Sequence, residues 1–324
     1  MKRTFFFLTL TKRRLLLGTA AFLFLAAGLS IQSEPDRMSV VAAMAGTQDE
    51  SLKQRIELLA KQYDTMPIDA KNDRVWRGIP GLNGVQVDVE ATYERAKQAG
   101  GERIEIIAKQ IPPRVHLQDL GPVPIYKGNP EKKQIALMIN VAWGTEYLPE
   151  MLKILQEQGV KATFFLDGSW TKKNAEEAKK IADAGHEIGN HAYSHPDMSR
   201  LSVAEQSSQI TRTNAVIEAA IGHKPKLFAP PSGAYGDNTV KTAHQLGMQT
   251  ILWSLDTVDW KRPSASTIVS RVLSRAENGT LVLMHPTEPT RDALRTIIPS
   301  LVKKGYQLVT VTELLDEKRP LPSL

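Results

Sequence analysis

From residue 133 onward, short apolar runs alternate with longer amphipathic stretches. The runs predict seven strands, at residues 134–140, 161–166, 187–190, 226–229, 249–255, 280–284 and 306–311. The stretches between them predict helices, one of which would begin at a capping box formed by Ser202 and Glu205. This alternation is typical of repeated βα units and a parallel sheet. Seven units in this length favour an α/β fold of the incomplete (β/α)7 barrel type over an open doubly wound sheet.

A smaller α+β pattern precedes the barrel. Apolar residues at helical spacing over 52–63 predict one amphipathic helix, with Ser51 and Gln54 as its capping box. The pattern then predicts a strand, a helix and a second strand, at residues 85–89, 91–98 and 104–107. We therefore expect a small α+β module over residues 33–120, a Pro- and Gly-rich linker over 121–131, and the barrel domain over 132–320.

The N-terminus predicts a targeting or anchoring segment over residues 1–32. An apolar run at 15–31 follows the basic cluster Lys12, Arg13 and Arg14. The length of this run lies at the short end for a bilayer span and above the usual length of a signal-peptide core. A signal anchor and a cleaved signal peptide therefore both remain open. Since the basic cluster keeps its end in the cytoplasm, we expect an exported body, either membrane-anchored through residues 15–31 or secreted.

The charge balance narrows the possible partners. The chain carries 41 Lys and Arg against 35 Asp and Glu, and five of the basic residues precede the first acid, Glu34. The remaining chain is nearly neutral, which leaves no basic surplus for a nucleic-acid-binding face. The chain contains no cysteine, so any metal would be held by His, Asp or Glu side chains.

Polar and aromatic residues gather where the predicted parallel strands end, and these ends meet at one mouth of such a barrel. The mouth would collect the residues Asn140, His191, His195, Pro230, Pro231, Gly233, Asp256, Asp259, Trp260 and His285. His191 and His195 are four residues apart, which in a helical turn places both imidazoles on one face, as two ligands of a zinc-type ion require. A solvated pair without metal is the alternative interpretation.

His285 follows a strand-like run and could act as a general acid, since histidine titrates near neutrality. Asp256 would raise its basicity if the two side chains meet. The alternative for His285 is a hydrogen-bonded core histidine. Trp260 and Leu283 could wall an apolar pocket at the same mouth.

Together these motifs resemble the polysaccharide deacetylases of the NodB-homology type, carbohydrate esterase family four, over about residues 132–315. The matching segments are the histidine motif, the Pro-Pro-x-Gly turn, the Asp-x-x-Asp-Trp segment and the Leu-x-Leu-x-His strand end. The resemblance implies hydrolysis of acetyl groups of cell-wall glycan with a divalent metal, zinc, cobalt or manganese. The anchor, the preceding module and the departures described next are similar to a sporulation-associated subgroup. Residues 84–96 are similar to small cell-wall-associated modules of exported bacterial proteins, although the module could also be a spacer above the membrane.

The first strand departs from the family pattern. Where the family carries two aspartates, a general base and a metal ligand, this chain has Asn140 and Val141, and Ala229 stands where an arginine orients the base. Loss of both the base aspartate and its arginine is tolerable, whereas loss of the aspartate alone would leave the buried charge of the arginine unpaired. Glu146 and Asp197 are the nearest acids that could replace a ligand or base, or they are solvated loop acids.

Two functions remain open from the sequence. The first is a metal-dependent deacetylase with a weakened site, in which metal on His191 and His195 polarises the acetamide and His285 protonates the leaving amine. The second is a catalytically inactive glycan-binding protein. Trp143, Tyr235 and Trp260 could stack on sugar rings in this case, or could serve as core packing.

Overall fold

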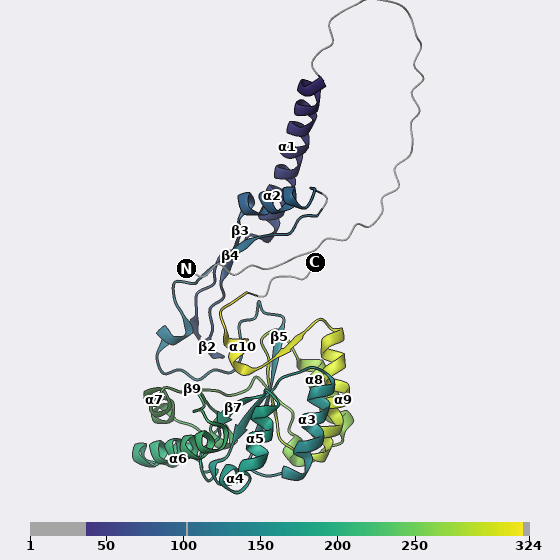
Figure 1. Cartoon of the computed structure of the whole chain (residues 1–324). Coiled ribbons are helices and arrows are strands. Elements are labelled where there is room, and N and C mark those ends of the chain that lie inside the picture. Colours follow the sequence, from purple (N-terminus) through teal and green to yellow (C-terminus); the bar gives the residue numbers. More distant parts are fainter. Residues whose placement is uncertain (1–36, 102, 320–324) are drawn as a thin grey trace, which may run out of the picture. The chain divides into compact units, whose positions relative to one another are not determined.

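The computed structural model describes residues 37–101 and 103–319, and within residues 37–48 it describes the backbone alone. The predicted targeting segment, with its apolar run at 15–31, lies outside the described residues. Within the described part of the chain, no helix is long and apolar enough to cross a membrane. The contacts divide the chain into two units, each of which is described below by itself (Figure 1).

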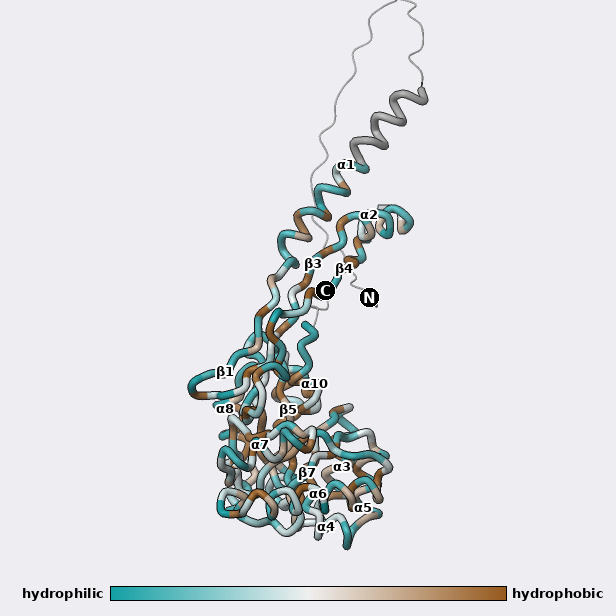
Figure 2. The backbone as a smooth tube through the Cα atoms, turned by 90° about the vertical axis from the view of Figure 1, so that its left-hand side faces the viewer, coloured by the Kyte–Doolittle hydropathy of each residue, from teal (hydrophilic) through white to brown (hydrophobic). Residues whose placement is uncertain are grey.

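The first described unit is a two-stranded antiparallel sheet with two helices. Its elements are α1 (Arg37–Tyr63), β3 (Gly84–Val87), α2 (Val89–Gln98) and β4 (Ala108–Ile111). Buried residues of both helices and both strands, among them Ile56, Val85 and Ala96, form one apolar cluster. The described part of α1 alternates between hydrophilic and hydrophobic residues (Figure 2), as expected for a helix with one buried face.

Two local predictions in this unit were wrong. Ser51 and Gln54 do not form a capping box, because α1 begins at Arg37 and both residues lie inside it. The second strand is β4, Ala108–Ile111, rather than residues 104–107. Ile104 and Ile106 are nonetheless buried in the apolar cluster, so their alternation reflects burial without strand pairing.

The second unit contains the predicted α/β fold, with a curled sheet in which every strand pair is parallel. Its sheet strands are β5 (Gln134–Val141), β6 (Thr163–Leu166), β7 (Glu187–Asn190), β8 (Leu227–Phe228), β9 (Gln249–Thr250), β10 (Leu255–Asp256), β11 (Leu281–Met284) and β12 (Gln307–Val309). The order is β10-β11-β5-β6-β7-β8-β9, with β12 also paired to β5. A separate hairpin consists of β1 (Lys71–Asp73) and β2 (Arg77–Ile79).

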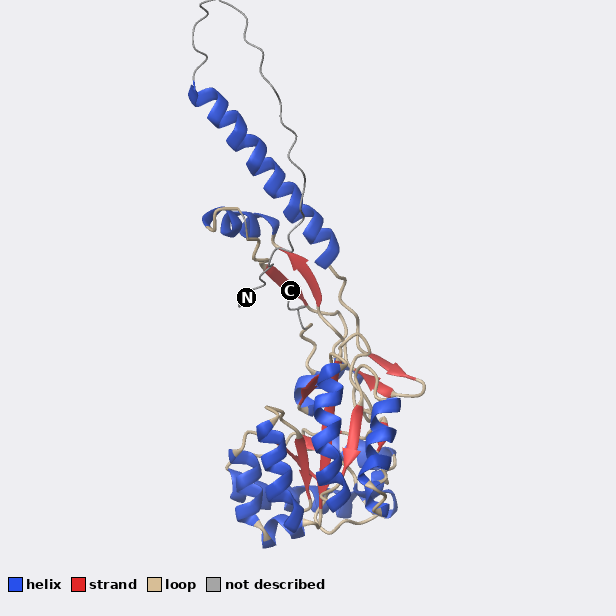
Figure 3. Cartoon of the chain, turned by 90° about the vertical axis from the view of Figure 1, so that its right-hand side faces the viewer, coloured by secondary structure: helices blue, strands red, loops and turns tan. Residues whose placement is uncertain are grey.

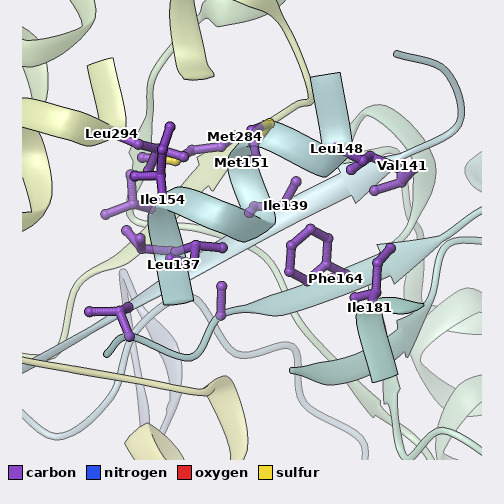
Figure 4. Close-up of a cluster of buried hydrophobic side chains, with 14 of the residues drawn as sticks. Leu137, Ile139, Val141, Leu148, Met151, Ile154, Phe164, Ile181, Met284 and Leu294 are labelled. Carbon is purple, nitrogen blue, oxygen red and sulfur yellow. The ribbon is translucent and has the colours of Figure 1, made fainter. Parts of the chain in front are cut away.

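Helices cover the outside of this sheet (Figure 3). They are α3 (Leu148–Glu157), α4 (Gly168–Lys173), α5 (Ala175–Asp183), α6 (Val203–Ile221), α7 (Asp237–Gln245), α8 (Ala265–Arg275) and α9 (Glu288–Lys303). The short helix α10 (Val311–Leu315) instead contributes its buried residues to an inner apolar cluster, which also contains Ala136, Met138 and Leu283. The predicted capping box of Ser202 and Glu205 begins α6 and is confirmed. The main apolar cluster lies between the strands and helices α3, α5 and α9 (Figure 4).

The predicted strand 249–255 is two strands, because its middle pairs elsewhere. Leu252 N–H donates to Ile125 O at 2.8 Å, and Ile251 forms a parallel bridge with Ile125. β9 therefore pairs with β8, whereas β10 pairs with β11, and the sheet has eight strands where seven were expected.

The predicted division into domains also changes. Residues 121–131 do not form a linker, since they lie inside the second unit and Ile125 is buried in its inner apolar cluster. Residues 68–82 belong to this unit as well, and residues 83–111 belong to the first. The module expected over 33–120 is therefore built from discontinuous segments.

Candidate functional site

The carboxyl end of β5 carries an amide at the position facing the inner apolar cluster. Ala136 and Met138 belong to that cluster, and strand alternation places Asn140 on the same side. Asn140 is 3% exposed, and its Oδ1 has no hydrogen-bond partner in the described part of the chain. An amide cannot accept a proton from water at neutral pH, so this position cannot act as a general base.

Val141 points the other way, into the main apolar cluster between the sheet and its covering helices. It is fully buried there together with Leu148 and Phe164 (Figure 4). The position at which the resemblance places a metal ligand therefore holds a side chain without a donor atom, packed among other apolar groups.

His191 and His195 do meet, although by a different route from the one predicted. They lie in a loop after β7 and not in a helical turn, and Ala192 and His195 have φ values of 58° and 55°. The loop brings the two rings to a centroid distance of 5.2 Å. His191 Nδ1 lies 2.8 Å from Ala229 O, so Nδ1 carries the proton that it donates, and Nε2 is left with its lone pair.

His191 is a neutral imidazole. Burial is the main cause that lowers its pKa to about 3, and the neighbouring His195 contributes to the shift. A neutral ring whose other nitrogen is fixed by a backbone carbonyl is the form in which histidine ligates metals.

The acids nearest in sequence do not complete a metal site. Glu146 is exposed, while Asp197 accepts a hydrogen bond from Ser199 N–H at 3.0 Å and pairs with Arg200 at 3.2 Å. Asp167, which follows β6, caps α4. Among the described residues no group of three His, Cys, Asp or Glu side chains could hold a metal ion. Catalytic zinc usually takes three protein ligands, so these residues do not fit a complete catalytic metal centre.

His285 pairs with Asp259 and not with Asp256. Asp259 Oδ1 lies 2.8 Å from His285 Nδ1, and Asp259 is fully buried. Asp256 Oδ1 instead accepts the N–H of Val258 at 2.7 Å. Val258 has a φ of 55°, which turns the chain so that the second aspartate, not the first, faces His285. The sequence placed both aspartates at the mouth, but the prediction that Asp256 contacts His285 was wrong, since Asp259 makes this contact.

Two further residues support this histidine. Thr290 Oγ1 donates to Asp259 Oδ2 at 2.6 Å, and the ring of Trp143 is stacked on His285 with a centroid distance of 5.8 Å and an interplanar angle of 6°. Trp143 is 40% exposed. The sequence predicted neither the role of Thr290 nor the stacking of Trp143.

The predicted pocket residues differ in accessibility. Pro230 and Pro231 are buried, and a Cβ at Gly233 would lie 2.8 Å from the Trp253 ring, so the turn packs closely on that ring. Leu283 is 3% exposed and belongs to the inner apolar cluster. Trp260 is 51% exposed and Tyr235 Oη lies 2.7 Å from Tyr126 Oη. Of the predicted apolar wall, only Trp260 therefore presents a large exposed surface.

Comparisons with known proteins agree with this geometry. A family model described as polysaccharide deacetylase matches residues 127–251. A Bacillus anthracis crystal structure described as a CE4 family pseudoenzyme shares 48% identity with a TM-score of 0.79, covering 83% of this chain and 96% of that one. The chain belongs to the polysaccharide deacetylase family. A solved mutant of that pseudoenzyme is described as having restored enzymatic activity, with 47% identity, a TM-score of 0.78, and coverage of 83% of this chain and 99% of that one.

Relatives of the deacetylase family found by sequence include both a described enzyme and a protein without a described activity. The Bacillus subtilis protein YlxY is 46% identical over 93% of this chain and 97% of its own length. A peptidoglycan-N-acetylglucosamine deacetylase of Bacillus cereus is 36% identical over 60% of this chain and 72% of its own length. Deacetylases of this family depend on a divalent metal.

Proposed function

We propose that this protein is an exported member of the deacetylase family that binds N-acetylated cell-wall glycan without appreciable deacetylation. The observation that carries the proposal is the end of β5, where Asn140 and Val141 supply neither a base nor a metal ligand. A positioned general base typically contributes about 10²- to 10⁴-fold to a rate, so its loss alone reduces turnover to a trace.

The rest of the site is consistent with retained recognition. His285 is fixed by Asp259, and Trp143 and Trp260 present exposed aromatic surface from the loops after β5 and β10. Aromatic rings combine a large apolar face with rigid geometry, which suits contact with the face of a sugar. The similarity to a described pseudoenzyme supports the same conclusion.

The context of this function is part of the proposal. Residues 15–31 would take the body across the membrane, leaving it anchored or secreted in the cell-wall space, and peptidoglycan in sporulating cells would be the ligand. The relatives described as peptidoglycan deacetylases support this substrate class.

Slow deacetylation is the second candidate function. It is favoured by the retained His285–Asp259 pair, because an imidazole held at Nδ1 presents Nε2 to protonate a leaving amine. It is also favoured by the free Nε2 of His191 beside His195.

Restoration of the missing groups separates the two functions. The full-length chain and the variant Asn140→Asp/Val141→Asp/Ala229→Arg would be compared for acetate release from N-acetylglucosamine oligomers with added zinc or cobalt. We expect release only from the variant. Matched rates for the two proteins would mean that the wild-type site does not need these groups, and would overturn the proposal.

A further inference from the structure

The structure contains an unbroken chain of contacts from the core to an exposed aromatic ring. Thr290 Oγ1 donates to Asp259 Oδ2 at 2.6 Å, Asp259 Oδ1 bonds His285 Nδ1 at 2.8 Å, and the His285 ring stacks on Trp143. The His285 side chain is only 15% exposed, whereas Trp143 is 40% exposed. The indole of Trp143 is therefore the solvent-exposed end of this series of contacts.

The backbone beside Trp143 is fixed as well. Gly144 has a φ of 77°, and a Cβ built there would collide with the carbonyl oxygen of Pro286, the residue after His285. The loop after β5 and the loop after β11 therefore touch at both the ring and the backbone. The backbone next to Trp143 is therefore closely packed against the loop that carries His285.

We infer that Trp143 is the ring on which the pyranose of an N-acetylated glycan stacks, and that His285 and Asp259 hold this ring in position. We call Trp143 with these two supporting residues the sugar-stacking platform. This inference rests on the proposed function and names the residue that recognises the glycan. The dyad acts by position, since His285 places the indole and transfers no proton.

The planes of the two rings are nearly parallel, at 6°, and their centroids are 5.8 Å apart, so the rings are offset. The histidine therefore orients the indole and leaves much of its apolar surface exposed, which suits contact with a sugar. Trp260 is a weaker candidate for the same role, because Lys261 Nζ lies over its ring at 4.9 Å from the centroid.

Substitutions at the two stacked residues test the inference. Binding of chitopentaose to the full-length protein would be measured by titration calorimetry, with thermal midpoints to verify folding. We expect Trp143→Ala to weaken binding by about 10-fold and Trp143→Phe by less, since phenylalanine keeps a smaller flat apolar face for the sugar. His285→Ala should weaken binding as well, because the indole of Trp143 loses the ring on which it is stacked.

The outcomes distinguish this inference from the proposed function. Binding that stays at the wild-type level in Trp143→Ala, or in His285→Ala, overturns the platform and leaves glycan binding intact. Absence of binding by the wild type would refute both. Trp260→Ala is the matched control, and a larger loss there than in Trp143→Ala also contradicts the inference.

Discussion

Asp259 Oδ1 lies 2.8 Å from His285 Nδ1, and the second oxygen of the same carboxylate accepts the His285 backbone N–H at 2.6 Å. Thr290 completes the set by donating its hydroxyl to Asp259 Oδ2. A buried carboxylate is tolerated only when its oxygens are bonded, so these contacts make Asp259 the centre of a rigid polar group. The His285–Asp259 pair is thus intact in a site where the end of β5 carries Asn140 and Val141 in place of carboxylates.

Removal of the buried aspartate should be much more costly than removal of its neighbour. We expect Asp259→Ala to lower the free energy of unfolding by about 3 kcal/mol, because three donors lose their acceptor. Asp256→Ala, which loses one contact with Val258, should cost less than about 1.5 kcal/mol. Urea denaturation measures both, and equal losses would mean that Asp259 does not organise the site.

The loop that carries Trp143 should be sensitive to a single methyl group. Gly144→Ala combines a positive φ with a collision against Pro286. We expect it to lower the free energy of unfolding by about 1–3 kcal/mol and to displace the indole of Trp143. Gly236→Ala is the matched control, since nothing lies within 4 Å of a Cβ built there. Thermal unfolding and tryptophan fluorescence would follow the two variants, and a wild-type midpoint for Gly144→Ala would contradict this packing.

The barrel was predictable because its strands are buried runs whose apolar pattern is local. The split at residues 249–255 was not, since it depends on pairing with Ile125, which is remote in sequence. The same limit applies to the site. His191, His195 and His285 follow strands and were identified, but the choice between Asp256 and Asp259 depends on the positive φ of Val258, which is rare for a β-branched residue.

Acid should destabilise the protein through His186. Burial lowers the pKa of His186 from 6.5 to about 4, and its Nδ1 accepts the N–H of Ala162 at 3.2 Å. Between these two values the unfolded chain binds more protons than the folded one, so stability falls as the pH drops from about 6.5 to about 4. His186→Asn should flatten this part of the pH dependence, while the exposed His223→Asn should not. Thermal midpoints across this pH range test the prediction, and an unchanged slope in His186→Asn would contradict it.

Glycan binding should be independent of metal. The described residues contain no three-residue metal group, and the proposed platform lies on His285 and Trp143. We therefore expect the same affinity for chitopentaose in the presence of a chelator and in His191→Ala, measured by calorimetry. A loss of affinity in both would show that the histidine pair takes part in binding.

The central claim is tested most directly by acetate release from peptidoglycan and N-acetylglucosamine oligomers by the full-length protein with added zinc, measured alongside glycan binding in the same preparation. The account predicts binding without release above the level of buffer. Release by the wild type that disappears with a chelator and in His191→Ala would contradict it and establish a metal-dependent deacetylase.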